Sequence, residues 1–149
     1  MKKACGRAGA TLVDLVVSLA ILSVVSTIAA PRLGAARDAW AAGVARDATI
    51  VVITRARTQA VVHGSARLAL DPAASTVAVE APIGVRNGDV LHLGQTWGVA
   101  LSVDHASGPV TIDFDGLGLG RLASRTLRFR RGSAEARVSL STYGRPRRW

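Results

Sequence analysis

An apolar run over residues 10–30 constrains this 149-residue chain more than any other feature. As a helix, these 21 residues span about 31 Å at 1.5 Å per residue, which is enough to cross the hydrocarbon core of a bilayer. The basic residues Lys2, Lys3 and Arg7 precede the run and are expected to hold this end in the cytoplasm. The sequence therefore predicts a single membrane-spanning helix near the N-terminus.

Asp14 is the one carboxylate in the run. A carboxylate well inside a membrane helix costs about 2.5–3.5 kcal/mol on insertion scales, and less near the interface. Asp14 therefore either has a functional partner or lies close enough to the interface to stay hydrated. An ordinary secretory signal would have a shorter apolar core without such a charge. A lipoprotein signal needs its Cys after the run, whereas Cys5 precedes it.

The residues around Asp14 resemble the processing site of type IV prepilins and pseudopilins. In that family a short basic leader ends in Gly, the fifth mature residue is an acid and the twenty-second is typically Pro. With Ala10 as the first mature residue, Asp14 is the fifth and Pro31 the twenty-second. The resemblance implies a leader over residues 1–9, cleavage between Gly9 and Ala10 by prepilin peptidase, and N-methylation of Ala10.

Two residues depart from the family pattern. Ala10 stands where Phe is usual, which suggests a minor subunit, and Asp14 stands where Glu is usual. The resemblance implies that Asp14 pairs with the N-terminus of a neighbouring subunit during filament assembly. Opposite charges in a low-dielectric bundle compensate each other's desolvation. The implied partners are other pilin or pseudopilin subunits, the prepilin peptidase and the inner-membrane assembly platform.

Helical periodicity continues past Pro31. Apolar residues recur at three- and four-residue steps and are expected to pack on the rest of the domain. These residues are Leu33, Ala36, Trp40, Val44, Ala48 and Val51. Gly64 is the expected C-cap. We therefore predict one helix over residues 11–63, in which residues 10–30 form the transmembrane and assembly segment and residues 31–63 an amphipathic continuation.

From residue 64 onward the pattern is that of short strands. Apolar or alternating runs bounded by Pro, Gly and Asp predict strands. The predicted strands are 67–70, 76–80, 90–93, 97–103, 110–114, 126–130 and 134–140. Asn87-Gly88 predicts a hairpin turn. The predicted fold class is α+β, pilin-like: a long N-terminal helix packed on a C-terminal antiparallel β-sheet domain over residues 64–142.

The last predicted hairpin has one apolar and one basic face. Leu127 and Phe129 alternate with Arg128 and Arg130. The apolar residues are expected to face inward, against the helix stripe that contains Trp40, and the arginines to face solvent.

The distribution of charge is uneven within the formal total of +9. Residues 121–149 carry nine arginines and one acid, whereas residues 10–120 carry seven arginines and nine acids. Such clustering indicates an acidic or nucleic-acid partner, or a solvated basic face. Cys5 is the only cysteine, so the mature chain would have no disulfide and no thiolate metal site.

Residues 54–70 are similar to the helix end and first strand of the GspH/FimT family of minor pseudopilins and minor pilins. The matching residues are Ala56, Arg57, Ala60 and Val61, followed by residues 67–70. This second resemblance is looser than the one at the processing site.

The basic tail, residues 143–149, contains Gly144-Arg145-Pro146-Arg147, which looks like the Gly-Arg-x-Arg ending of GspH/FimT-type proteins. In minor pilins of that kind the ending has been associated with DNA capture during natural transformation. Arginines can reach phosphates, and Tyr143 or Trp149 could stack on an unpaired base. The candidate DNA-binding residues are Arg145, Arg147, Arg148, Arg128 and Arg130. The tail could instead cap a strand edge or contact a neighbouring pilin.

Signals for catalysis are poor. His63, His92 and His105 show no metal-ligand spacing on one element, and the chain has no Gly-x-Ser-x-Gly turn. The glycine-rich residues 115–121 lack the following helix that a phosphate-binding loop needs, so we predict a flexible loop there. Asp113 is expected to be solvated. We predict no enzyme activity, no cofactor and no metal site.

These features together predict a structural subunit. The expectation is a minor pseudopilin of a type II secretion system or a minor pilin of a type IV pilus. It would be a single-pass protein of the bacterial inner membrane, with its C-terminal domain in the periplasm, that enters a periplasmic or surface filament. The alternative is a minor pilin that binds DNA for uptake. The sequence does not separate the secretion system from the pilus.

Overall fold

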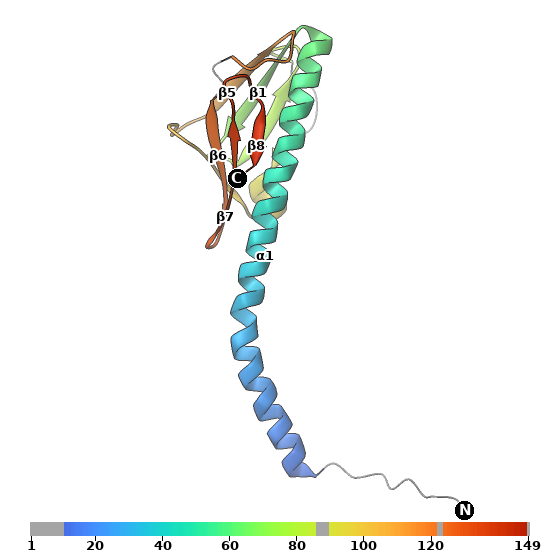
Figure 1. The fold of residues 1–149 in the computed structure, drawn as a ribbon, viewed down its shortest axis with the longest axis vertical. Helices are drawn as coiled ribbons and strands as arrows, with labels where there is room; N and C mark the ends of the chain where they lie inside the picture. The colour runs from blue at the N-terminus through green and yellow to red at the C-terminus, as the bar shows by residue number, and fades with distance from the viewer. Residues whose placement is uncertain (1–10, 86–89, 122–123, 149) are drawn as a thin grey trace, which may run out of the picture. The chain divides into compact units, whose positions relative to one another are not determined.

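The structure is a computed structural model that describes residues 11–85, 90–121 and 124–148. The chain divides into two compact units, residues 1–34 and residues 35–149. Helix α1 (Leu12–His63) begins in the first unit and ends in the second. The other elements are β1 (Ser65–Asp71), β2 (Thr76–Glu80), β3 (Leu91–His92), α2 (Leu93–Trp97), β4 (Ala100–Val103), β5 (Val110–Asp115), β6 (Arg125–Arg131), β7 (Ala134–Leu140) and β8 (Pro146–Arg148) (Figure 1).

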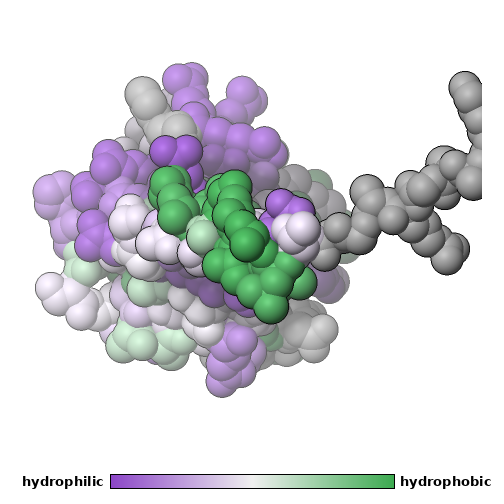
Figure 2. Space-filling model, turned by 90° about the horizontal axis from the view of Figure 1, so that it is seen from below, coloured by the Kyte–Doolittle hydropathy of each residue, from purple (hydrophilic) through white to green (hydrophobic). Residues whose placement is uncertain are grey.

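The described part of the first unit is an exposed apolar helix. Its large side chains, from Leu12 to Ile28, are 50–80% exposed, and Figure 2 shows apolar atoms gathered in the foreground. The hydroxyls of this segment donate hydrogen bonds to carbonyl oxygens three or four residues earlier. The donors are Ser18, Ser23, Ser26 and Thr27. These bonds satisfy each hydroxyl inside the helix, as an apolar environment requires.

The second unit contains two antiparallel sheets that share one core. Their strand orders are β3-β2-β1-β5 and β4-β6-β7-β8. Leu68 and Phe114 of the first sheet and Leu127 and Phe129 of the second are each at most 1% exposed. The inward orientation predicted for Leu127 and Phe129 is confirmed. Phe129 pairs with Leu101 of β4 and Ala136 of β7, which fixes the register of the second sheet.

The predicted packing face of α1 is wrong. Trp40 and Val51 are both 66% exposed, and the helix contacts the core through Ile53 and otherwise small residues on the opposite face. The buried residues are Ala41, Ala42, Ala45, Thr49, Ile53, Ala56 and Ala60. Small side chains let the helix backbone approach the sheets closely. Alanine also occurs on the other faces of α1, so periodicity of large apolar residues pointed to the exposed side.

Two predicted strands are also wrong in part. Residues 90–93 were expected to form a strand, but β3 covers only Leu91–His92 and the chain then turns into α2. This helix ends at Trp97 and is capped by Gly98, which has φ +63° and donates its N–H to the carbonyl oxygen of Gly94, while the N–H of Val99 donates to the carbonyl oxygen of Leu93. The strand predicted over residues 97–103 therefore begins only at residue 100. The Asn87-Gly88 turn lies outside the described residues.

Ser75, in the turn between β1 and β2, joins the two sheets. Its carbonyl oxygen accepts a hydrogen bond from the N–H of Leu93 at 2.9 Å. Its Oγ accepts one from the N–H of Leu101, in β4, at 3.1 Å. The turn of the first sheet thereby holds α2 and the edge strand of the second sheet.

Candidate functional site

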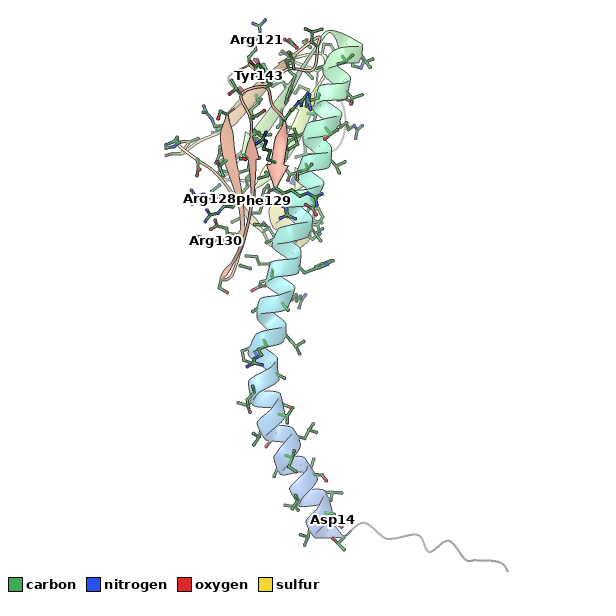
Figure 3. The ribbon with its side chains drawn as sticks, in the orientation of Figure 1. Asp14, Arg121, Arg128, Phe129, Arg130 and Tyr143 are labelled. Atoms are coloured by element: carbon green, nitrogen blue, oxygen red, sulfur yellow. The ribbon has the colours of Figure 1, made fainter. Side chains whose placement is uncertain are left out.

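Asp14 forms a capping box with Thr11 at the start of α1 (Figure 3). The backbone N–H and the hydroxyl of Thr11 donate to Asp14 Oδ2 at 3.1 and 2.8 Å. The N–H of Asp14 donates to Thr11 Oγ1 at 3.3 Å. This reciprocal arrangement satisfies free N–H groups of the first turn. The sequence prediction missed this partner, although the Thr-x-x-Asp spacing signals it. Gly9 and Ala10 lie outside the described residues.

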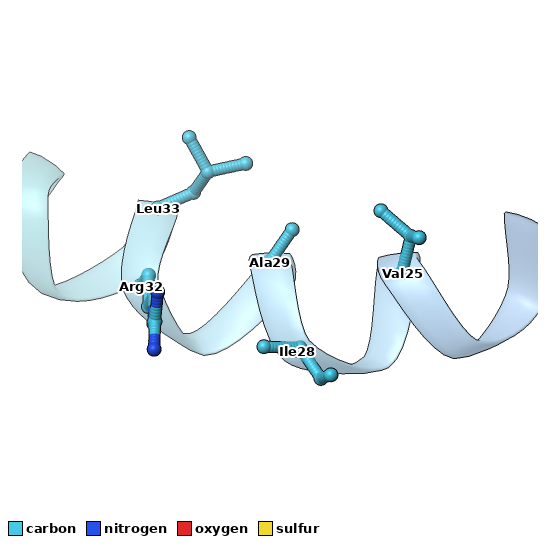
Figure 4. Close-up of a pocket in the computed structure, with 5 residues that line it drawn as sticks. All are labelled: Val25, Ile28, Ala29, Arg32 and Leu33. Atoms are coloured by element: carbon cyan, nitrogen blue, oxygen red, sulfur yellow. The ribbon is translucent and has the colours of Figure 1, made fainter.

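The apolar surface of the first unit is a helix face and not a ligand pocket. Figure 4 shows a shallow hollow lined by Val25, Ile28, Ala29, Arg32 and Leu33, all of which belong to one helix. Because no second element walls the hollow, it cannot enclose a ligand. Helix α1 is long and apolar enough to span a membrane, with a mean hydropathy of 2.3 in an apolar window that is not buried. An exposed helix of this kind is consistent with single-pass anchoring. Pro31 lies inside α1, as predicted.

Arg128 and Arg130 each form an ion pair on the outer face of the second sheet (Figure 3). Arg128 Nη2 lies 2.9 Å from Asp104 Oδ1, and Arg130 Nη2 lies 3.1 Å from Glu135 Oε2. Hydrogen bonds from Arg137 and from Arg130 lower the pKa of Glu135 below its usual value. The predicted solvent-facing orientation of Arg128 and Arg130 is confirmed, but both are ion-paired, and Arg130 shares Glu135 with Arg137.

The C-terminal residues form an ordered edge strand. In β8, Arg147 lies opposite Ser139 and Pro146 opposite Leu140 of β7. Arg148, the next residue of β8, points to the opposite face of the strand from Arg147. Its Nε lies 3.7 Å from Asp47 Oδ1 on α1.

Arg145 and Arg147 are exposed cations at the β8 edge of the second sheet. Both are exposed, and in the part of the chain that the structure describes their side chains have no ion-pair partner. They are thus the arginines at this edge that are available to an anionic partner. Trp149 lies outside the described residues.

Gly144 allows the preceding turn to pack on the first sheet. It has φ +73°, and a Cβ at this position would lie 2.6 Å from Phe114 Cε1. The turn is further fixed by a hydrogen bond from the N–H of Gly120 to the carbonyl oxygen of Tyr143, at 3.2 Å. Tyr143 is 63% exposed and lies near Arg121 (Figure 3). The glycine of the Gly-Arg-x-Arg sequence therefore serves the fold, while the exposed Tyr143 and arginines are open to a partner.

The glycine-rich residues 115–121 form a defined turn, and the predicted flexible loop is wrong. Asp115 Oδ1 accepts hydrogen bonds from the N–H groups of Leu117 and Leu119, both at 2.9 Å. Arg57 Nε of α1 donates to the carbonyl oxygen of Gly118 at 2.9 Å. The glycines allow the backbone to pass close to α1, because a Cβ on Gly118 would lie 3.1 Å from a helix carbonyl oxygen.

Asp113 is partly exposed, as expected, but it is also ion-paired. Arg67 Nε and Nη2 donate to its two carboxylate oxygens at 2.6 and 3.0 Å. This hydrogen bonding lowers the pKa of Asp113. Within the described ranges, no three His, Cys, Asp or Glu side chains gather where they could hold a metal ion.

The sequence matches no family model and no curated protein. Among solved structures, the chain is similar to the type IV minor pilin FimU of Pseudomonas aeruginosa strain PAO1, with a TM-score of 0.56 and 13% sequence identity. The match covers 72% of this chain and 87% of that chain. The chain thus has a pilin-like fold, in which a long N-terminal helix packs on C-terminal antiparallel sheets. The predicted fold class is confirmed.

Proposed function

We propose that this chain is a minor pilin or pseudopilin, a structural subunit of a type IV pilus or of a type II secretion pseudopilus. Prepilin peptidase cleaves it between Gly9 and Ala10 and methylates Ala10. Residues 10–30 then hold the subunit in the inner membrane until the assembly platform moves it into a filament with other pilin subunits. Asp14 pairs with the N-terminus of a neighbour at that step.

The observation that carries this proposal is an exposed apolar helical segment, from Leu12 to Ile28, in a chain with a pilin-like β domain. All large apolar side chains from Leu12 to Ile28 are at least half exposed, so this segment needs a membrane or other helices around it. A carboxylate on such a helix needs a compensating partner. Because Thr11 fills that role within the single chain, assembly exchanges the Thr11 contacts of Asp14 for the charged terminus of a neighbour.

Processing is tested by replacing Gly9 with a bulky residue. In cells that contain a prepilin peptidase, Gly9→Leu should leave the leader attached, and mass spectrometry should show the full-length N-terminus. The unsubstituted chain should lose nine residues and gain one methyl group. Normal processing of the variant would reject the prepilin assignment.

The role of Asp14 is tested with two variants that separate charge from capping. Asp14→Asn keeps a side-chain oxygen that can accept from Thr11, whereas Asp14→Ala removes both the charge and the cap. If charge pairing drives assembly, both variants should be inserted and cleaved but should be missing from purified filaments. Assembly of Asp14→Asn at normal levels would show that capping suffices.

A second candidate function is DNA binding at the C-terminal edge. It is favoured by the exposed Arg145 and Arg147, which have no ion-pair partner among the described residues, and by the exposed Tyr143 beside them. Guanidinium groups contact phosphates without regard to sequence, and an aromatic ring can stack on an unpaired base. Arg128 and Arg130, which are ion-paired, are weaker candidates for the same partner.

The DNA hypothesis is tested by titrating the detergent-solubilised full chain with single- and double-stranded DNA at several salt concentrations. The variant with Arg145, Arg147 and Arg148 changed to Ala should lose about 0.9 from the logarithmic salt slope per lost phosphate contact on duplex DNA. The Arg128→Ala/Arg130→Ala variant is the matched control and should change the slope less. Equal slopes in all three proteins would exclude the edge as a DNA site.

A further inference from the structure

The outer face of the first sheet contains a hollow with a volume of 410 Å³. Its floor is made of short side chains from three neighbouring strands. Ala69 of β1 lies opposite Ala78 of β2 on one side and opposite Thr111 of β5 on the other. His92 and Pro109 contribute to its walls. We call this feature the alanine hollow.

Two carboxylates at the alanine hollow have no ion-pair partner in the part of the chain that the structure describes. Asp71 lines the hollow at the end of β1, and its Oδ1 accepts hydrogen bonds from two backbone N–H groups of the following turn. Glu80 lies at the end of β2, on the same face as Ala78 and opposite Arg67. Arg67 donates from Nε and Nη2 to Asp113. Asp71 and Glu80 are therefore both available to a cation.

Cations that could meet these carboxylates lie on the second sheet. Arg145 and Arg147 are exposed and, among the residues described, form no ion pair. Their backbone is fixed: the N–H of Arg145 donates to Ser141 Oγ at 3.1 Å, and Arg147 lies opposite Ser139 of β7. A fixed backbone presents the two guanidinium groups without the entropic cost of ordering a loop on binding. We call Arg145 and Arg147 the basic edge.

The basic edge and the alanine hollow are turned away from each other within one copy. The hollow includes Val110, at the start of β5. The C-terminal turn contacts the other end of that strand, because Gly120 bridges to Phe114 and donates its N–H to the carbonyl oxygen of Tyr143. These two ends are four residues apart, about 13 Å. Moreover, the inner faces of both sheets share the core, so their outer faces point in different directions. Only a second copy can bring the two patches together.

We propose that the basic edge of one copy docks in the alanine hollow of a second copy, with its guanidinium groups on Asp71 and Glu80. Arginine binds carboxylates with paired N–H groups, and its aliphatic stem covers apolar surface such as the alanine floor.

This contact is heterologous, because it joins two different patches. A heterologous contact that does not close into a ring continues from copy to copy as a filament. The inference rests on the filament role proposed above, and it names the surface through which one β domain holds the next.

The test measures self-association of the detergent-solubilised full chain by sedimentation velocity. The unsubstituted chain should associate at about 0.1 M salt and dissociate at about 1 M, where the Debye length falls from about 10 Å to about 3 Å. Two variants reverse the charge of one patch each: Arg145→Glu/Arg147→Glu and Glu80→Lys/Thr111→Lys. Each places like charges in contact and should weaken association at least about tenfold.

The matched control is Arg37→Glu/Arg55→Glu. Both arginines are exposed on α1, and within the described ranges neither forms an ion pair. The control has the same change in net charge as the variant of the basic edge, but it should associate like the unsubstituted chain. An equal loss of association in the control would mean that net charge alone matters, and this would overturn the docking.

The decisive measurement mixes the two charge-reversed proteins. In the mixture, the glutamates of one protein meet the lysines of the other, so association should return although neither protein associates alone. Restoration also shows that both variants are folded. If the mixture stays dissociated while circular dichroism of each variant matches that of the unsubstituted chain, the docking is overturned. A variant that does not fold is replaced by its neutral form, Arg145→Gln/Arg147→Gln or Glu80→Gln, which should still weaken association and its dependence on salt.

Other partners of the basic edge give different results. If Arg145→Glu/Arg147→Glu abolishes binding of DNA but leaves self-association unchanged, the edge binds nucleic acid and the docking is overturned. Association of the unsubstituted chain that does not depend on salt would come from its apolar helices, and this also contradicts the docking. None of these outcomes affects the processing test at Gly9, so the docking can fail while the assignment as a filament subunit stands.

Discussion

Gly144 is held by two constraints at once. Any L side chain there meets two costs, a left-handed backbone with φ +73° and a Cβ placed 2.6 Å from Phe114 Cε1. The first costs about 1–2 kcal/mol and overpacking of a core typically adds about 1–3 kcal/mol. We therefore expect Gly144→Ala to lower the free energy of unfolding by about 2–5 kcal/mol in denaturant titrations.

Two control glycines separate these costs. Gly84 has φ +92°, but a Cβ at this position would have no atom within 4 Å, so Gly84→Ala should show only the backbone cost of about 1–2 kcal/mol. Gly108 has neither feature, and Gly108→Ala should stay within about 0.5 kcal/mol of the unsubstituted chain. If Gly144→Ala were no worse than Gly84→Ala, the contact with Phe114 would not matter.

The ion pair between Arg67 and Asp113 predicts a loss of stability in acid. Hydrogen bonds from Arg67 lower the pKa of Asp113 in the folded chain, whereas in the unfolded chain it is about 3.9. The stabilisation is therefore complete above the unfolded pKa and is lost as the pH falls through the folded one. Because the two side chains are 33% and 41% exposed, the pair contributes at most about 1 kcal/mol.

This pH dependence is measured by comparing urea unfolding near pH 6 and near pH 3 in the unsubstituted chain and in Asp113→Asn. The variant should lose less stability on acidification, because its side chain cannot titrate. Arg67→Met and the double variant complete a thermodynamic cycle, in which the coupling between the two residues should disappear at low pH. If the coupling free energy between Arg67 and Asp113 were equal at both pH values, the contact would stabilise the fold through packing and not through charge.

Single residues also show what the sequence could and could not predict. The Thr-x-x-Asp spacing at Thr11 and Asp14 is local, so their capping box was open to prediction from the sequence. The need for a glycine at position 144 could not be predicted from the sequence. Phe114 lies 30 positions away, and only the folded chain brings the two residues together. The same holds for Arg67 and Asp113, which are 46 positions apart.

At the scale of elements, the packing face of α1 gives a direct test. Ala45 is 0% exposed, so Ala45→Leu must force extra volume between the helix and the sheets. Such overpacking typically costs about 1–3 kcal/mol. Ala36 is exposed on the same helix, and Ala36→Leu should change the free energy of unfolding by less than about 0.5 kcal/mol. Equal losses of stability for Ala45→Leu and Ala36→Leu in denaturant titrations would contradict the packing of α1 on the sheets through its alanine face.

The elements themselves were predictable to different degrees, for physical reasons. Apolar residues alternate with charged or polar ones over residues 127–130 of β6 and along β7, and both strands match the prediction to within one residue at each end. The alanine face of α1 was missed because alanine is too small and too frequent to mark one side of a helix. Helix α2 was missed because it is a single turn, stopped by Gly98 and held by its contact with Ser75.

At the scale of the whole molecule, the hydrophobic core belongs to one unit. The buried apolar residues run from Ala41 to Leu140, all within the unit over residues 35–149. The large apolar side chains in the described part of the first unit are exposed, which is consistent with the proposed anchorage. Folding and the proposed anchorage therefore involve different stretches of one chain, although α1 contributes to both.

This division predicts that a chain starting at Ala35 folds without residues 1–34. It keeps Ala41 and the other buried residues of α1 and every strand that they contact, so it should unfold in one cooperative transition. Its midpoint should equal that of the β domain in the detergent-solubilised full chain, because the removed residues bury no side chain of the core. Circular dichroism during heating measures both transitions. A broad transition at lower temperature would mean that the apolar segment supports the fold as well as the anchorage. A sharp, matching transition would mean that the fold of the domain does not depend on the apolar helix.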